Sequence, residues 1–246
     1  SRPEKRRISR RHQRRIHSEK VNIVKSGHRR RPLFVNGKGD YMKVLIINGS
    51  PRANGNTSVA VREVENVLKA EGIEVKTVQI GGRDIRGCIA CGRCSELGKC
   101  AIDDTVNELA GEFESADGLI VASPVYYASA NATLIACLDR LFYSTPFDKT
   151  MKVGASIVCA RRGGCSATFD ELNKYFTISN MPIASSQYWN SIHGRVKGEA
   201  ELDEEGKQTM RTLARIMTFL MKSIALGSAK YGLPEKEPRV ATNFIG

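Results

Sequence analysis

The chain has 246 residues, of which 41% are hydrophobic, a proportion typical of a globular protein with a substantial core. No segment has the roughly 20 consecutive apolar residues of a membrane span, and seven cysteines are too few for a disulfide scaffold of this length. These features exclude membrane-spanning and disulfide-rich classes and predict a cytoplasmic protein. The formal net charge of +12 is compatible with nucleic-acid binding, so the position of the basic residues matters.

The excess positive charge lies at the start of the chain. Residues 1–41 hold 14 of the 38 Lys and Arg residues and 3 of the 26 Asp and Glu residues, so the remainder is nearly neutral. This segment has few large apolar side chains and cannot build a core. Three interpretations stay open: a non-native extension upstream of Met42, a solvated tail, or an arm that binds nucleic acid. Its basic residues are not interleaved with aromatic ones, which argues against nucleic acid.

After Met42, short apolar runs alternate with segments of helical period, the pattern of a parallel sheet covered by helices. The pattern predicts strands over residues 44–47, 73–78, 118–122, 152–159 and 183–186, and helices over residues 57–70, 106–113, 131–142, 169–176 and 203–226. Asp103 or Asp104 is expected to cap the second helix, and Gly227 to end the last. The expected domain spans residues 42–230, with a C-terminal extension over residues 231–246.

The first candidate site joins the first strand to the first helix. Residues 48–58 read Asn-Gly-Ser-Pro-Arg-Ala-Asn-Gly-Asn-Thr-Ser. Backbone N–H groups at a helix start lack intrahelical partners and attract anions, and Arg52 adds a cation. The glycine patterns of dinucleotide and P-loop sites are absent from this loop. The loop therefore predicts a mononucleotide phosphate site, and the alternative is a polar turn with a helix cap.

Two further loops follow the third and fourth strands. Because parallel strands present their carboxyl ends at one edge of a sheet, these loops are expected to converge on the first one. They offer aromatic faces, close backbone approach and fixed cations, from Pro124, Val125, Tyr126 and Tyr127 in one loop and Arg161, Arg162, Gly163 and Gly164 in the other. Packing aromatics and a solvated arginine pair are the alternatives.

These loops, with the Leu-Asp-Arg of residues 138–140, resemble the NADPH-dependent FMN reductase family over about residues 42–226. The resemblance implies a flavodoxin-like α/β fold, a doubly wound five-stranded parallel sheet of order 2-1-3-4-5, and a homodimer or homotetramer. It also implies a set of FMN-phosphate ligands, Ser50, Arg52, Asn56, Thr57 and Ser58. The flavin ring would lie against residues 124–127 and 161–164.

Four of the seven cysteines fall within thirteen positions: Cys88, Cys91, Cys94 and Cys100. Clustered cysteines point to metal or redox chemistry, and soft sulfur ligands suit iron–sulfur clusters or zinc. Within the family, this spacing resembles the iron–sulfur flavoproteins, whose motif binds a [4Fe–4S] cluster. The segments around residues 161–164 and 187–194 look more like reductases without a cluster, so a reduced structural or redox-sensing loop and a zinc site stay open.

The sequence thus predicts an FMN-dependent oxidoreductase in which NAD(P)H reduces flavin, quinone or similar small-molecule acceptors, with the chemistry on FMN rather than on a catalytic side chain. If the cluster is present, ferredoxin becomes a suitable partner. The alternatives are a flavodoxin-like electron carrier without its own small-molecule substrate and a nucleic-acid-binding protein working through residues 1–41. No membrane partner is expected.

Overall fold

The computed structural model describes residues 41–238 and 240–242. The interpretations of the basic segment before Tyr41 therefore lie outside the described residues. Within the described part, no helix is both long enough and apolar enough to cross a membrane.

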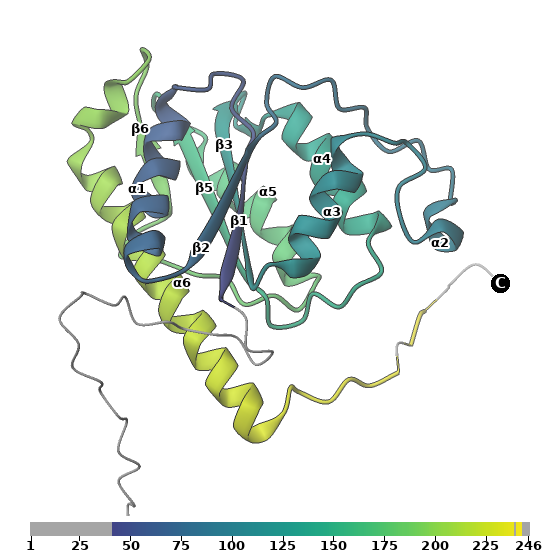
Figure 1. Cartoon of the computed structure of the whole chain (residues 1–246). Coiled ribbons are helices and arrows are strands. Elements are labelled where there is room, and N and C mark those ends of the chain that lie inside the picture. Colours follow the sequence, from purple (N-terminus) through teal and green to yellow (C-terminus); the bar gives the residue numbers. More distant parts are fainter. Residues whose placement is uncertain (1–40, 239, 243–246) are drawn as a thin grey trace, which may run out of the picture. The chain divides into compact units, whose positions relative to one another are not determined.

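A central sheet organises the described part (Figure 1). Its strands are β1 (Lys43–Asn48), β2 (Glu74–Gln79), β3 (Gly118–Tyr126), β4 (Ser129–Ala130), β5 (Val153–Ala160) and β6 (Ser191–His193). Five of them are parallel in the order β2-β1-β3-β5-β6, which confirms the expected 2-1-3-4-5 arrangement. The predicted end of β3 at residue 122 was wrong, because the strand runs on to Tyr126 and then turns back into the short antiparallel β4, a sixth strand beside the five parallel ones.

The predicted fifth strand, residues 183–186, is also wrong. Ile183 makes only an isolated bridge to Gly154, and the fifth parallel strand is β6, farther along the chain. The Ser186 hydroxyl lies 2.8 Å from Asn190 Oδ1 and also contacts the Tyr188 carbonyl, which turns the chain away from β5. The strand therefore forms only after this turn, opposite residues 158–160.

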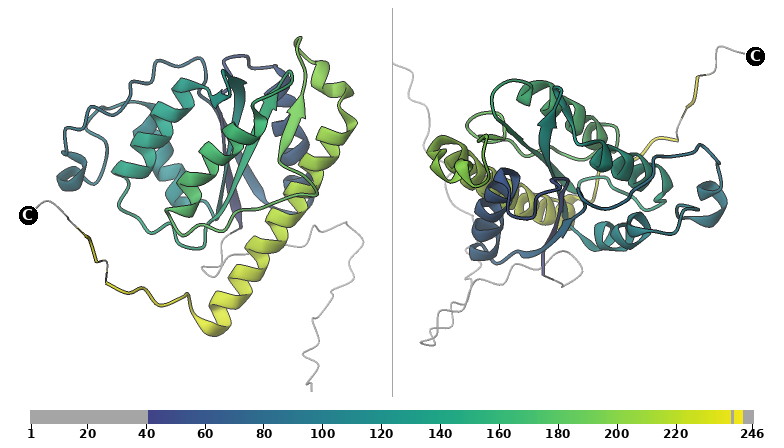
Figure 2. Two further views of the ribbon diagram at one scale, coloured as in Figure 1. Left: turned by 180° about the vertical axis from the view of Figure 1, so that it is seen from behind. Right: turned by 90° about the horizontal axis from the view of Figure 1, so that it is seen from above.

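Helices cover both faces of the sheet, as the view from above shows (Figure 2). They are α1 (Asn56–Ala70), α2 (Cys94–Leu97), α3 (Thr105–Ser115), α4 (Ala132–Ser144), α5 (Cys165–Thr177) and α6 (Glu204–Tyr231), with a 3₁₀ helix η1 (Glu199–Leu202). The apolar stripes of α1 and α6 form one core with the sheet, and those of α3, α4 and α5 form the other. The central strands are apolar on both faces because both faces are buried.

The last helix is longer than predicted. It passes through Gly227 and ends at Gly232, whose φ is +78° and whose N–H donates to the Ser228 carbonyl. A glycine inside a helix costs only about 1 kcal/mol relative to alanine, and good helix formers surround Gly227. The helix stops at a positive φ that glycine adopts readily, shortly before Pro234.

Candidate functional site

The loops after β1, β3 and β5 meet at the carboxyl edge of the sheet, as predicted. The contact between the second and third loops is close: a Cβ on Gly164, whose φ is +95°, would lie 2.9 Å from Ala128 Cα and from Val125 Cγ1. The loop after β2 packs equally closely on the first, since a Cβ on Gly81 would lie 2.2 Å from the Gly49 carbonyl oxygen. These loops can approach each other so closely only because glycine, which lacks a Cβ, occupies both positions.

Polar side chains fix the shape of the loop after β1. Asn48 Oδ1 accepts the Ser50 N–H at 3.0 Å, and Asn48 Nδ2 donates to Ser58 Oγ and to Gln79 Oε1, both at 3.2 Å. Ser50 Oγ accepts the Arg52 N–H at 3.2 Å. The hydroxyls of Ser50 and Ser58 are thus buried within the loop and shape it rather than point out of it.

The start of α1 has the features of an anion site. No side chain caps it and no acidic residue lies in its first turn. The Ser58 N–H already donates to the Gly55 carbonyl at 3.0 Å, so the N–H groups of Asn56 and Thr57 are the ones left for a ligand. The helix dipole favours negative charge there. Arg52 is exposed beside this start, and Thr57 is buried in the first turn. Asn56 is otherwise engaged, donating to the Val196 carbonyl at 2.9 Å and accepting the Ala200 N–H at 3.2 Å.

The predicted ring-binding aromatics lie on the β3–β4 hairpin. Tyr126 is about half exposed, and Tyr127 is fully exposed at the turn with a φ of +51°. Ala128 also has a positive φ, +61°, so both turn residues adopt a conformation that favours glycine or asparagine. The Glu171 carboxylate holds the hairpin by accepting the Ala130 N–H and the Ser129 hydroxyl, each at 2.9 Å.

Exposed cations flank the third loop. Arg161, Arg162 and Gly163 are exposed, and Gly164 leads into α5, whose first turn has neither a side-chain cap nor an acidic residue. The same edge of the sheet therefore presents a second uncapped helix start beside two arginines, an arrangement suited to anionic groups.

The sequence did not indicate that Cys165 at the start of α5, His193 at the end of β6 and Asp203 at the N-cap of α6 lie close together. His193 Nε2 lies 3.8 Å from Cys165 Sγ, and Asp203 Oδ2 lies 3.5 Å from His193 Nδ1 and accepts the His193 backbone N–H at 2.7 Å. Burial raises the pKa of Cys165 and so favours its thiol form. Only the pairing of β6 with β5 brings this imidazole beside the first residue of α5.

The four clustered cysteines line one cavity of about 870 Å³, together with residues of α4 and α5. Cys88 and Cys91 are exposed, Cys94 and Cys100 are half-buried, and all four are free thiols. The loop that carries them reaches to the side of α3 and α4, away from the loop after β1 (Figure 1). In the described ranges, no three His, Cys, Asp or Glu side chains are close enough together to hold a single metal ion.

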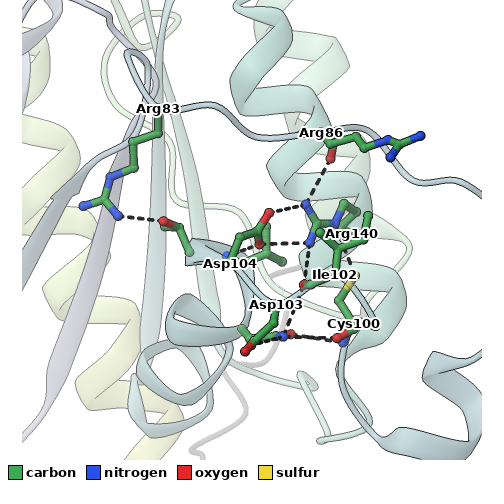
Figure 3. A network of polar contacts seen from close by, with 10 residues as sticks. Arg83, Arg86, Cys100, Ile102, Asp103, Asp104 and Arg140 are labelled. Atoms are coloured by element: carbon green, nitrogen blue, oxygen red, sulfur yellow. Dashed lines mark hydrogen bonds and ion pairs between the residues drawn. The ribbon is translucent and has the colours of Figure 1, made fainter.

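Side chains of α3 and α4 hold Cys100 in place (Figure 3). Arg140 Nε donates to its sulfur at 3.2 Å. Asn107 of α3 accepts the Cys100 N–H and donates to the Cys100 carbonyl, both at 3.1 Å. In the loop itself, the Ala90 N–H lies 3.4 Å from Cys88 Sγ. Backbone and side-chain N–H groups thus already point at two of the four sulfurs.

Arg140 is the largest fully buried side chain in the described residues and was not predicted to have a role. Its guanidinium forms a two-pronged pair with Asp104, with Nη1–Oδ2 at 2.7 Å and Nη2–Oδ1 at 2.9 Å. Burial alone would raise the pKa of Asp104, but the bonds from Arg140 and Val106 lower it. Arg140 lies in the buried stripe of α4 between Cys137 and Ser144, a charge at an apolar position that sequence alone could have flagged.

Cys137 and Cys159 are buried, unlike the four cysteines of the loop. Burial raises the pKa of Cys137 to about 12 and that of Cys159 to about 12, although a hydrogen bond with Thr57 lowers the latter. Thiols in such an environment behave as small apolar packing residues.

Known proteins resemble this chain in sequence. The family model for NADPH-dependent FMN reductase matches residues 42–195. An iron–sulfur flavoprotein of Methanocaldococcus jannaschii is 34% identical over 194 residues, covering 74% of this chain and 99% of that protein. An iron–sulfur flavoprotein of Methanosarcina thermophila is 34% identical over 188 residues, covering 74% and 97%.

Solved structures share the fold at low sequence identity. RosB with bound 8-demethyl-8-formylriboflavin-5'-phosphate has a TM-score of 0.56 at 14% identity, covering 83% of this chain and 92% of that one. The apo form of the NADH:FMN oxidoreductase EMOB has a TM-score of 0.53 at 18% identity, covering 72% and 89%. These likenesses support the flavodoxin-like α/β architecture.

Proposed function

The chain belongs to the NADPH-dependent FMN reductase family, and we propose that it is an FMN-dependent oxidoreductase that accepts electrons from NAD(P)H and carries a [4Fe–4S] cluster on the Cys88–Cys100 loop. One observation carries the FMN part: the loops after β1, β3 and β5 lie at one edge of the sheet, and the first leads into α1, whose start has neither a side-chain cap nor a first-turn acid. A phosphate fits that position because helix N–H groups and Arg52 supply its ligands.

The residues predicted for the phosphate divide into two roles. The first-turn N–H groups of α1 and the exposed Arg52 would bind the phosphate directly, with Thr57 at the floor of the site. The hydroxyls of Ser50 and Ser58 would hold the loop in its binding shape, since both are engaged in hydrogen bonds inside it. Asn56 would fix the 196–200 segment against the loop.

The flavin ring would rest on the hairpin and the glycine loop. Pro124–Tyr127 would supply its apolar contacts, and Gly163 and Gly164 close backbone approach, with Arg161 and Arg162 nearby to balance negative charge on the ring. Bound FMN supplies hydride or single-electron transfer at its N5 atom. The protein's part is to bind the cofactor, orient the ring and shield one face.

The cysteine loop fits an iron–sulfur cluster in its donor set and surroundings. Four free thiols line one cavity, and the Arg140 and Ala90 N–H groups point at Cys100 and Cys88. Cys88, Cys91, Cys94 and Cys100 would be the ligands, and the cluster would supply one-electron transfer. Because Cys88 and Cys91 are exposed, a redox protein such as a ferredoxin could exchange electrons at this edge.

We also propose a homo-oligomer. Helix α6 exposes large apolar side chains, among them Phe219 and Leu226, which lie two turns apart on one face, and Tyr231 at its end. Exposed apolar side chains gathered on one helix are typical of subunit contacts. The oligomeric state is measurable by light scattering, and Phe219→Ser combined with Leu226→Ser would then yield a monomer.

The test is anaerobic purification followed by absorbance spectra before and after NADPH is added, with iron and acid-labile sulfide assays. We expect flavin bands that bleach with NADPH, together with broad iron–sulfur absorbance and matching iron and sulfide. A protein that cannot be reconstituted with FMN would contradict the flavin assignment. Flavin bands without iron or sulfide would contradict the cluster, and zinc in place of iron would assign the loop to a structural metal.

A second candidate function is an electron carrier without its own small-molecule substrate. It is favoured by the names of the relatives, which are iron–sulfur flavoproteins rather than reductases. Rapid multiple turnover of NADPH with a quinone or free flavin would exclude this candidate. Reduction by ferredoxin alone, without NADPH turnover, would establish it.

A further inference from the structure

We propose that Arg140 is a positioning residue that sets the reduction potential of a cluster bound at Cys100 and clamps both ends of the cysteine loop. The proposal rests on the cluster assigned under the proposed function and extends it to a residue outside the cysteine motif. The geometry of one buried guanidinium on α4 carries it (Figure 3).

Each of the five N–H groups of Arg140 has an acceptor. The two Nη atoms bind the Asp104 carboxylate, and they also donate to the carbonyls of Arg86 and Ile102, each at 3.0 Å. The remaining donor, Nε, points at Cys100 Sγ. A guanidinium presents these five donors in a rigid fork, so the four oxygen contacts fix the direction of the fifth.

The two carbonyl contacts lie at opposite ends of the cysteine loop. Arg86 precedes Cys88, and Ile102 follows Cys100, so one side chain joins the loop's entry to its exit. If Arg140 made only these contacts, its burial could be explained by a structural role in closing the loop. The contact with sulfur is additional, because clamping the loop requires only the Nη atoms.

Contact with the sulfur has an electrostatic consequence for a bound cluster. Reduction adds negative charge, which N–H groups directed at ligand sulfurs and a buried cation both stabilise. The Arg140 side chain is only 1% exposed, so water screens its charge weakly. Asp104, 22% exposed, opposes the effect with a negative charge on the far side of the guanidinium. Arg140 should therefore raise the reduction potential of the cluster, and Asp104 should lower it.

The test measures midpoint potentials of the anaerobically purified, cluster-loaded full chain in redox titrations followed by electron paramagnetic resonance. Arg140→Lys keeps a cation but loses the fork, and the cluster should become harder to reduce by at least about tenfold in the equilibrium, which is 59 mV for one electron. Asp104→Asn retains a good helix cap and should shift the potential the opposite way. The exposed Arg93 of the same loop provides the control, and Arg93→Lys should leave the potential unchanged.

A lower midpoint potential in Arg140→Lys and a higher one in Asp104→Asn would support the inference. If Arg140→Lys fails to retain iron, a higher potential in Asp104→Asn supports it alone. Iron-loaded variants whose potentials both match the wild type would overturn it and leave Arg140 as a structural clamp. A wild-type chain that binds FMN but no iron overturns the cluster and this inference together, while the FMN assignment stands.

Discussion

Asp104 and Arg140 join the start of α3 to the middle of α4 through two hydrogen bonds, of 2.7 and 2.9 Å. The same Asp104 carboxylate caps α3 by accepting the Val106 N–H at 3.0 Å. One acidic side chain therefore satisfies a helix terminus and neutralises a buried cation. Neutralising Arg140 requires an ionised carboxylate, whereas a neutral oxygen can also cap the helix, so the pair links the stability of this region to pH.

Replacing Arg140 should destabilise the protein strongly even without a cluster. Arg140→Leu removes the partner of Asp104 and frees two loop carbonyls, and breaking a buried pair costs about 3–5 kcal/mol. Because Asp104 is partly exposed, we expect roughly 2–4 kcal/mol in the free energy of unfolding, measured by urea titration of the iron-free protein.

The matched control is Arg62→Leu. Arg62 pairs with Glu201 on the surface, where both side chains are about half exposed, and such a pair contributes only about 0–1 kcal/mol. Equal losses in the two variants would contradict a special role for the buried pair.

The contribution of Asp104 should disappear in acid. Its pKa in the folded protein is lowered, so its stabilising effect is fully present above the unfolded value of about 3.9 and is lost as the pH falls through the folded pKa. The stability difference between wild type and Asp104→Asn should be largest near about pH 6 and shrink below about pH 4. Urea midpoints across this range measure it, and a difference independent of pH would argue that the charge is not involved.

Arg52 should distinguish FMN from riboflavin. If its guanidinium binds the phosphate, Arg52→Ala loses a charge-assisted contact worth about 1.5–3 kcal/mol, so the Kd for FMN should rise roughly 10- to 150-fold. Riboflavin has no phosphate, and its Kd should stay the same. Fluorescence quenching titrations with both flavins provide the measurement. Equal weakening for the two flavins would show that Arg52 acts on the ring or on the fold.

Gly164→Ala should disturb the junction of the ring-binding loops. Gly164 has a φ of +95°, and an added Cβ would lie 2.9 Å from a backbone atom of Ala128. Strain of this kind costs about 1–3 kcal/mol, and displacement of the hairpin should weaken FMN binding as well. Thermal unfolding and FMN titration measure the two effects.

A glycine without these constraints serves as the control. Gly111 lies exposed inside α3, and a Cβ added there would meet no packing neighbour within 4 Å, so Gly111→Ala should stabilise the protein by about 0.5–1 kcal/mol. A neutral Gly164→Ala would show that the loops can shift apart without consequence.

Loss of one motif cysteine should remove iron, whereas loss of a buried cysteine should not. Cys91 is exposed in the loop, so Cys91→Ala should abolish most cluster occupancy with little effect on the fold. Cys137 has a pKa raised to about 12 by burial, and Cys137→Ala should retain iron. Iron and sulfide assays on both proteins decide this, and full iron content in Cys91→Ala would refute the four-cysteine ligand set.

The local sequence determined most of the fold. Apolar runs and helical periods placed the central strands and main helices, because a strand buried on both faces and an amphipathic helix must each carry their pattern in consecutive residues. The spacing of the four cysteines likewise identified a candidate site, and Asp104 was among the two residues expected to cap α3. The position of β6 and the end of α6 were not predictable in this way, since one depends on a hydrogen-bonded turn and the other on a glycine with a positive φ.

Only the tertiary structure decided which distant side chains meet. Arg140 and Cys100 are 40 positions apart, and their contact follows from the packing of α4 against the loop rather than from any local pattern. The same holds for His193 beside Cys165, which the parallel pairing of β6 with β5 brings together. Local propensities act over a few residues, whereas these contacts arise when the two faces of the sheet are covered and each buried polar group must find a partner.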